Sequence, residues 1–368
     1  MLNGTELARY ARQIVLPELG TSGQERLRAA SVLVVGAGGL GSPAALYLAA
    51  AGVGTLGIVD DDIVEIGNLH RQILHGTQDV GRAKVASADA RLRVLNPEVK
   101  VVAHRERLNA QNSAEILENY ELVVDGSDNY STRYAVNDGC AAAGIPWIYG
   151  SVERFSGQVS VFGAPDGPCY RCLFPEPPEP GTTASCEEIG VLGAVPGVVG
   201  ALQAVEALKW LAGVGEPLVG RLFQLDLLNG ESRTIQFDRR SDCPVCSKRE
   251  ENEDVELELD EPEDLVDVQP GELAERLADA ADVGLLDVRD PWEWNVARLK
   301  DATLLPMNEL PARIASLDRT KELIVYCHHG TRSSMAADWL RSRGFRARSL
   351  AGGIDRWSRE IDPTVPRY

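Results

Sequence analysis

The glycine-rich turn at residues 36–41, GAGGLG, constrains the fold more than any other feature of the chain. It follows the apolar run 31–35, opens a run of small residues, and is followed by a second apolar run at 55–60. This order predicts a strand, a tight turn, a helix and a parallel strand, which together form the βαβ unit that binds nucleotides. The uncharged stretch 31–59 is long enough to span a bilayer, but its glycines and Pro43 favour two buried strands around one helix.

The same turn predicts a contact with phosphate. It contains Gly36, Gly38, Gly39 and Gly41, which permit a tight bend and a close approach of the backbone to a ligand at a helix N-terminus. Asp60 ends the next strand about 20 residues on, where a carboxylate would hold a ribose hydroxyl. The alternative is a glycine-rich turn that binds no ligand.

Strand-like and helix-like segments alternate through the rest of the chain. Apolar strand patterns at 121–128 and 145–151 flank a helical run at 131–144. Further strand patterns follow at 157–163, 221–228 and 233–238, with an apolar helix at 198–213, and a second, smaller series begins near residue 284. The pattern predicts an α/β fold with a mostly parallel, Rossmann-like sheet and a second small α/β domain.

Residues 248–264 divide the two patterns, because they hold ten acidic residues against two basic residues and show no apolar period. We therefore predict a first domain at 1–247, an acidic flexible linker at 248–265 and a second domain at 266–368.

Charge and cysteine content narrow the class of protein. The net charge of -18 argues against a nucleic-acid partner, since no basic footprint exists. The first residues are charged and lack an apolar core, so we expect neither a signal peptide nor a membrane partner. Seven cysteines without a secretion signal favour a reducing, cytoplasmic setting in which the thiols serve metal binding or chemistry.

Charged and amide side chains follow the predicted ribose-binding position. They are Asn68, Arg71, Gln72 and Lys84, and Asp128 ends a later strand. Cations that stabilise charge on phosphates, together with a carboxylate that holds a metal, suit ATP with Mg²⁺. Hydride transfer needs none of these groups. An NAD-dependent oxidoreductase stays open as the alternative, because the glycine turn alone fits it too.

Several ordered motifs across residues 5–247 resemble the ThiF/MoeB family, the bacterial relatives of ubiquitin-activating enzymes. They are RYARQIVLPELG, VLVVGAGGLGSP, IVDDDIVEIGNLHRQILH, VGRAKVA, DGSDNYSTRY and GVLGAVPGVVG. The resemblance implies a homodimer that adenylates the C-terminal glycine of a ubiquitin-like sulfur-carrier protein. It also implies the site roles: Gly39 and Asp60 would bind the nucleotide backbone and ribose, Asn68, Arg71, Gln72 and Lys84 the phosphates, Asp128 with Asn129 the magnesium, and Arg12 the ATP of the partner subunit.

Four of the cysteines form two C-x-x-C pairs, Cys169 with Cys172 and Cys243 with Cys246. Two pairs of thiolates complete a tetrahedral site, so the pattern predicts structural zinc ahead of redox pairs. No coordination position stays open for chemistry.

Two further cysteines differ in their surroundings. Cys140 lies among small residues on a predicted helix, which favours a buried apolar role. Cys186 lies in a polar loop after a proline-rich stretch, where functional residues concentrate. In the ThiF/MoeB family the matching cysteine links covalently to the carrier, which implies that Cys186 is a second nucleophile.

Cys327 ends a predicted strand and opens the loop CHHGTR before a helix. Backbone N–H groups, the helix dipole and Arg332 would favour an anionic sulfur there. The six-residue loop, with LLDVRDPWEW and LAGGIDRW, resembles the rhodanese family over about 266–365. Ala297-Arg298-Leu299 departs from the His-Ile pair common in that family. The resemblance implies that Cys327 carries a persulfide.

The two sites combine into one predicted reaction. ATP converts a carboxylate into an acyl adenylate, and a persulfide is a sulfur nucleophile that can attack it. We expect a carrier ending in Gly-Gly to become a thiocarboxylate, with sulfur from thiosulfate or a cysteine desulfurase persulfide, for molybdopterin, thiamin, cysteine or thio-tRNA synthesis. The alternatives are an oxidoreductase with an appended sulfurtransferase and a non-enzymatic scaffold.

Overall fold

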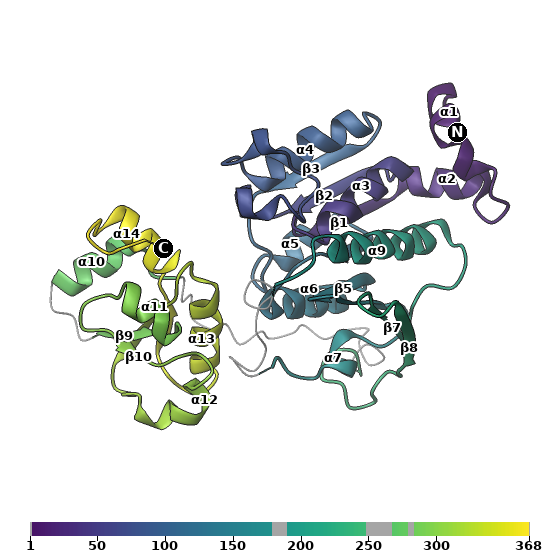
Figure 1. The fold of residues 1–368 in the computed structure, drawn as a ribbon. Helices are drawn as coiled ribbons and strands as arrows, with labels where there is room; N and C mark the ends of the chain where they lie inside the picture. Colours follow the sequence, from purple (N-terminus) through teal and green to yellow (C-terminus); the bar gives the residue numbers. More distant parts are fainter. Residues whose placement is uncertain (1, 179–189, 248–266, 279–282, 368) are drawn as a thin grey trace. The chain divides into compact units, whose positions relative to one another are not determined.

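The computed structural model describes residues 2–178, 190–247, 267–278 and 283–367, which form two compact units (Figure 1). The first unit holds 2–177 and 190–247, and the second holds 267–278 and 283–367. Cys186 and the whole of the predicted linker, 248–265, lie outside the described residues. The boundaries at 247 and 266 therefore stay predictions.

The first unit is built on an eight-stranded sheet in the order β3-β2-β1-β4-β5-β6-β7-β8. The first five strands in this order pair in parallel, and the last three are antiparallel. The strands are β1 Ser31–Val35, β2 Thr55–Val59, β3 Lys100–His104, β4 Leu122–Asp125, β5 Trp147–Glu153, β6 Ser156–Phe162, β7 Arg221–Asp226 and β8 Glu231–Gln236.

Helices cover both faces of this sheet. They are α1 Gly4–Ile14, α2 Gly20–Ala29, α3 Gly41–Ala51, α4 Lys84–Leu95, α5 Ser113–Leu117, α6 Tyr130–Ala143, α7 Tyr170–Leu173 and α9 Ala194–Ala212, with short 3-10 turns η1 Ile66–Asn68 and η2 Thr77–Asp79. Alternate residues of β1 divide between two cores: Val32 and Val34 belong to the cluster that includes α3, α4 and α9, whereas Leu33 and Val35 belong to the cluster that includes α5 and α6. A strand buried on both faces reads as a continuous apolar run, which is how β1 appears in the sequence.

The order of strands reverses at β1, which lies between β2 and β4. The carboxyl ends of these strands are tied together, since Gly36 N–H donates to Val59 O at 2.8 Å and Gly126 N–H donates to Val35 O at 2.7 Å. Ligands of open α/β sheets bind at such a switch point. The glycine turn and the residues after β4 therefore meet at the edge where a nucleotide is expected.

The second unit has a four-stranded parallel sheet in the order β10-β9-β11-β12. Its strands are β9 Val283–Asp287, β10 Thr303–Leu304, β11 Glu322–Tyr326 and β12 Ala347–Ser349. Its helices are α10 Pro270–Ala278, α11 Pro291–Val296, α12 Leu310–Arg313, α13 Thr331–Arg341 and α14 Gly353–Glu360, with the turn η4 Ile314–Ser316. Two apolar clusters share the residues of β11 between them, so this strand is the centre of the unit.

These two sheets confirm the predicted fold class. The stretch 31–59 forms β1, α3 and β2 as expected. Within the described residues, no helix has the length and apolar character needed to cross a membrane.

Two candidate active sites and a thiol cluster

Steric contacts explain the glycine turn. Gly36 has a φ of 85°, in the left-handed region that favours glycine. A Cβ on Gly41 would lie 1.8 Å from the Gly36 carbonyl oxygen, so no side chain fits there. A Cβ on Gly39 would be 3.2 Å from Pro196 and 3.6 Å from Arg71, which places α9 and the segment after β2 against the turn.

Asp60 anchors the turn from the end of β2. Its Oδ2 atom accepts the N–H of Ala37 at 2.8 Å, and its Oδ1 atom accepts the N–H of Asp62 at 2.8 Å. Burial is the main cause of the raised pKa of Asp60. Each carboxylate oxygen keeps acceptor capacity for a hydroxyl, which agrees with the predicted ribose role.

Lys84 brings a buried positive charge to the same edge. Its Nζ atom lies 2.9 Å from Asp62 Oδ2, and its side chain is 7% exposed. Burial works to lower the pKa of Lys84, but Asp60, Asp62 and Asp128 outweigh burial and raise the pKa. The ammonium is therefore charged at neutral pH. A bound phosphate could take the place of Asp62 as its ion-pair partner.

The segment after β2 holds the other predicted phosphate ligands. Asn68 ends η1, and its Oδ1 atom accepts from Arg71 Nη2 at 3.2 Å. Gln72 is buried with 5% exposure. Within the part of the chain that the structure describes, Gln72 Oε1 and Ser42 Oγ are buried without a hydrogen-bond partner. Buried polar atoms are rarely left unpaired, so these two atoms fit an edge built to receive a polar ligand.

Asp128 is exposed after β4, and Asn129 caps α6 by accepting the Thr132 N–H at 2.9 Å. The Asn129 side-chain oxygen thus has a structural task, and its magnesium role stays a prediction. Arg107 also reaches this area, where it pairs with Asp61 at 3.4 Å. Burial works to lower the pKa of Arg107, but the carboxylates of Asp61, Asp62 and Asp128 outweigh burial and raise it. Sequence patterns missed Arg107 because it follows β3 outside every motif.

Arg12 does not lie at its own chain's nucleotide turn. It is exposed on α1, and the neighbouring Gln13 donates to Ala51 O at 3.2 Å. The ring of Tyr10, on the same helix, packs against Gly52 so closely that a Cβ on Gly52 would lie 2.4 Å from Tyr10 Cζ. Because α3 starts at the turn and ends at Ala51, α1 is attached about 15 Å along that helix from the turn.

The four paired cysteines form one buried cluster. The Sγ atoms of Cys169 and Cys172 are 3.9 Å apart, Cys169 and Cys243 are 3.5 Å apart, and Cys172 and Cys246 are 3.4 Å apart. Zinc bonded to four sulfurs at about 2.3 Å requires S···S distances of about 3.8 Å, so the arrangement fits a tetrahedral ion. Burial raises the pKa of Cys172 to about 11, whereas at Cys243 burial is outweighed and backbone N–H groups of Cys246 and Val245 help to lower the pKa to about 7. Holding all four sulfurs as thiolates in this buried place would require a cation.

Cys327 follows β11 and is 2% exposed. The Gly330 N–H donates to Cys327 Sγ at 3.1 Å. The Ser333 Oγ atom lies 3.5 Å from the same sulfur, but it is closer to the Gly330 carbonyl oxygen, at 3.0 Å, and to Ser349 Oγ, at 2.9 Å. Gly353 approaches from α14, and a Cβ there would lie 2.5 Å from the Cys327 carbonyl oxygen. The loop thus directs a backbone donor at the sulfur and places a hydroxyl beside it, which suits an anionic sulfur.

Arg332, the last residue of this loop, is held by a carboxylate. Its Nη1 and Nη2 atoms donate to the two oxygens of Glu293, both at 2.7 Å. Glu293 is 3% exposed and also accepts the N–H of Asp290 at 3.0 Å, which caps α11. The predicted fixed positive charge is thus held in place by an ion pair, and the catalytic role of Arg332 stays a prediction.

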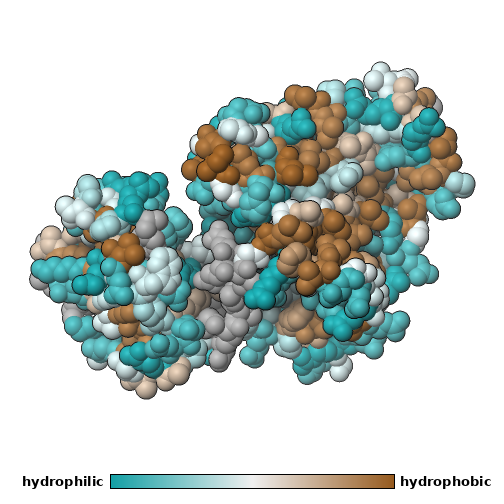
Figure 2. All heavy atoms as spheres, viewed as in Figure 1, coloured by the Kyte–Doolittle hydropathy of each residue, from teal (hydrophilic) through white to brown (hydrophobic). Residues whose placement is uncertain are grey.

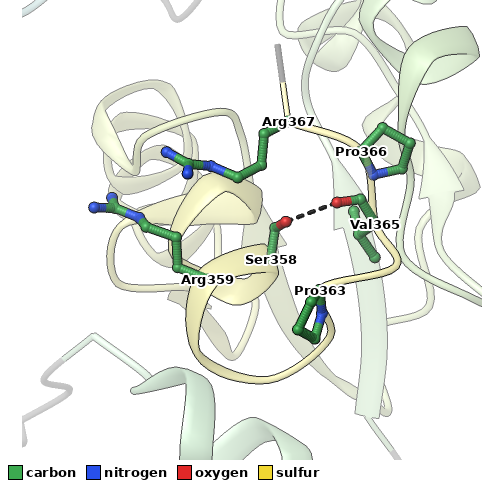
Figure 3. A pocket seen from close by; sticks show the side chains of 6 residues that line it. All are labelled: Ser358, Arg359, Pro363, Val365, Pro366 and Arg367. Atoms are coloured by element: carbon green, nitrogen blue, oxygen red, sulfur yellow. Dashed lines mark hydrogen bonds between the residues drawn. The ribbon is translucent and has the colours of Figure 1, made fainter.

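The rim of the loop is held by Asp355 at the start of α14. The two loop histidines, His328 and His329, stack with ring centroids 4.0 Å apart, and His329 Nδ1 lies 3.9 Å from Asp355. Asp355 also pairs with Arg359 at 2.5 Å and Arg367 at 2.9 Å. Figure 3 shows Arg359 and Arg367 extending side by side from α14 and the C-terminal segment.

The chain matches two family descriptions: the ThiF family over residues 10–245 and the Rhodanese-like domain over residues 269–360. It is 41% identical to the probable adenylyltransferase/sulfurtransferase MoeZ of Mycobacterium tuberculosis, an alignment that covers 100% of this chain and 96% of that protein. It is 42% identical to the bovine adenylyltransferase and sulfurtransferase MOCS3 over 100% of this chain and 89% of that protein.

Two more comparisons concern the first unit. The sulfur carrier protein adenylyltransferase of Thermus thermophilus is 54% identical over 66% of this chain and 91% of its own length. A crystal structure of Escherichia coli MccB with ATP has a TM-score of 0.58 at 23% identity, and the match covers 65% of this chain and 74% of that chain. The latter likeness concerns the fold.

Proposed function

The chain belongs to the ThiF family and carries a rhodanese-like domain, and we propose that it uses ATP to adenylate the C-terminal glycine of a ubiquitin-like sulfur-carrier protein and then delivers sulfur from Cys327. It is an adenylyltransferase and sulfurtransferase, as the full-length relatives are named. The single observation that carries the proposal is the presence of both sites on one chain: a charged switch-point edge and a buried thiol that accepts the Gly330 N–H.

The residues present fit ATP at the first site. Asp60 would accept ribose hydroxyls, while Lys84, Arg71, Asn68 and Gln72 would bind phosphates as the carrier carboxylate attacks the α-phosphorus and pyrophosphate leaves. Positive groups aimed at the phosphates stabilise the charge that builds there. Asp128 would hold Mg²⁺, which neutralises phosphate charge when bound.

Sulfur transfer follows at Cys327. The persulfide, loaded from thiosulfate or a cysteine desulfurase, attacks the carbonyl carbon of the acyl adenylate, and AMP leaves. The product is an acyl disulfide on Cys327. A second thiol then attacks the Cys327 sulfur, which releases the thiocarboxylate and leaves a disulfide between the two thiols, and an external thiol reduces that disulfide. We propose Cys186 for that second thiol; it lies outside the described residues.

We further propose a homodimer built on α3 and α9. Tyr47 on α3 and Val198 and Val205 on α9 are exposed at 57%, 41% and 49%, and Figure 2 shows hydrophobic side chains gathered over these helices. A second copy of the first unit would cover them. The placement of Arg12 far along α3 from its own turn supports a role at the partner's ATP.

The reaction is tested with the full chain, ATP, thiosulfate and a carrier ending in Gly-Gly. We expect ATP–pyrophosphate exchange that depends on the carrier, and mass spectrometry should show one oxygen replaced by sulfur. Carrier-independent reduction of NAD without exchange would instead support the oxidoreductase alternative.

The dimer is tested by mixing two inactive variants. Arg12→Ala and Lys84→Met should each lose exchange, whereas a mixture should regain about one quarter of the activity, because some heterodimers carry one intact composite site. A mixture that stays inactive, or a monomeric mass in solution, contradicts this part of the proposal.

A further inference from the structure

His75 is a buried side chain with no place in the reaction described so far. It lies between the glycine turn and α4 and is 8% exposed. Its Nε2 atom is 2.9 Å from the Ala37 carbonyl oxygen, and its Nδ1 atom is 2.9 Å from Ser87 Oγ. A carbonyl oxygen can only accept a hydrogen bond, so Nε2 carries the proton and Nδ1 of the neutral ring accepts from the Ser87 hydroxyl. The Ala37 carbonyl therefore sets the tautomer, whereas the Ser87 hydroxyl can donate or accept and is also hydrogen-bonded to the Asp79 carboxylate.

The backbone around Ala37 is held on both sides. Asp60 accepts its N–H at 2.8 Å, and His75 donates to its carbonyl oxygen. In a trans peptide the C=O and the following N–H point in opposite directions. When the Ala37 carbonyl is turned toward His75, the Gly38 N–H is turned away from it.

Gly38 is where the backbone of this turn would meet a phosphate. Among the described residues, the Gly38 N–H has no hydrogen-bond acceptor. α3 begins three residues later at Gly41, so the positive end of that helix dipole adds to the field. An N–H with a fixed direction and no protein partner is arranged for an anionic ligand.

We propose that His75 is a positioning residue for the nucleotide: by donating from Nε2 to the Ala37 carbonyl, it presents the Gly38 N–H to a phosphate of ATP. This inference rests on the proposed ATP site and adds a residue that does not touch the ligand.

Burial, together with the charge of Lys84, keeps the His75 ring in the neutral form. Burial is the main cause of the lowered pKa of His75, and the Lys84 ammonium of α4 lowers it further. The Asp79 carboxylate of η2 and the bond to Ala37 act in the opposite direction. A neutral ring with its proton on Nε2 is the form that the geometry requires.

Two amide substitutions separate positioning from packing. Glutamine carries its amide nitrogen as many bonds from Cβ as His Nε2, and asparagine carries its nitrogen as many bonds from Cβ as His Nδ1. His75→Gln keeps a donor for Ala37, whereas His75→Asn leaves the carbonyl without one. We expect His75→Asn to weaken ATP binding by calorimetry about tenfold, which corresponds to about 1.4 kcal/mol, and His75→Gln to weaken it less than about threefold.

The kinetic readout should follow binding. His75→Asn should raise the KM for ATP in exchange and leave kcat within about twofold, because saturating ATP restores the phosphate contact. Cyanide-dependent sulfur transfer at Cys327 and the melting temperature without nucleotide serve as folding controls in each variant.

The outcomes are separable. If the unmodified chain neither binds ATP nor catalyses exchange, the proposed function fails and this inference fails with it. If the unmodified chain is active and His75→Asn binds ATP equally well, or both amides weaken it equally, the inference alone is overturned.

Discussion

Arg332 and Glu293 form a bidentate ion pair, with both N–O distances at 2.7 Å, across 39 residues of sequence. The pair joins the sulfur loop to the first turn of α11. Arg332 therefore fixes the position of the loop in addition to supplying a positive charge. Because Glu293 is 4% exposed at its side chain, its carboxylate depends on this partner.

Breaking the pair from the arginine side should therefore be the costly change. We expect Arg332→Gln to lower the unfolding free energy of the second unit by about 3 kcal/mol, since a buried carboxylate loses its cation. The double variant with Glu293→Gln should recover at least about 1 kcal/mol, because two neutral amides can pair. A urea unfolding cycle measures this; strict additivity of the two changes would rule out the coupling.

Cys327→Ala should separate the two activities. Thiocarboxylate formation should fall to background because no sulfur can attack the acyl adenylate, while ATP–pyrophosphate exchange should stay within about twofold of the unmodified chain. Mass spectrometry and exchange assays on the same preparation check both. Loss of exchange in this variant would show that the sulfur loop takes part in adenylation.

The cysteine cluster gives a prediction about metal and stability. Cys243→Ser should release zinc and destabilise the first unit by more than about 4 kcal/mol, because three buried thiols cannot complete the site. Cys140→Ala, a change at a buried cysteine of α6 outside the cluster, should keep the metal. Metal analysis and calorimetry decide the point; an unchanged metal content in Cys243→Ser excludes the zinc site.

From the ion pairs of Asp355 we predict that the unfolding free energy of the second unit depends on pH. Burial works to raise the pKa of Asp355, but Arg367 and Arg359 outweigh it and hold the pKa below the ordinary value of 3.8. A carboxylate whose pKa is lower in the folded state than in the unfolded chain stabilises the fold at pH values above its unfolded-state pKa. This contribution is lost as the pH falls through its folded-state pKa.

Asp355→Asn should thus lower the unfolding free energy at pH 7 by about 1 kcal/mol, since both arginines are largely exposed. The difference from the unmodified chain should shrink below about pH 4 and vanish near pH 2. Glu360→Gln, which removes an exposed ion pair with Arg356 on the same helix, is the matched control and should cost less. A difference for Asp355→Asn that does not change with pH contradicts the assignment.

Local sequence patterns predicted both sheets and the principal site motifs. The glycine turn, the strand before it and Asp60 are close in sequence, and the turn's geometry follows from the absence of side chains. The C-x-x-C pairs also predicted their own site, since two thiolates at that spacing can bind one metal ion. The site roles given to Asn68, Arg71, Gln72, Asp128 and Arg12 rest on family resemblance and stay predictions.

Other residues could not be found in this way. Arg107, Glu293 and Ser333 lie in no short motif, and their partners come from other elements of the fold. The family resemblance implies a magnesium role for Asn129, which stays a prediction, and the structure adds that its oxygen caps the first turn of α6.

Short-range patterns predicted most of the strands, the glycine turn, the paired thiols and the position of Cys327, because each depends on residues near one another in the chain; they missed β3 and β12. The pairing of Glu293 with Arg332 and the contact of His75 with Ala37 became visible once the chain was folded. Such pairs form when the sheets bring distant segments together, and burial then makes each partner's hydrogen bond or charge costly to remove.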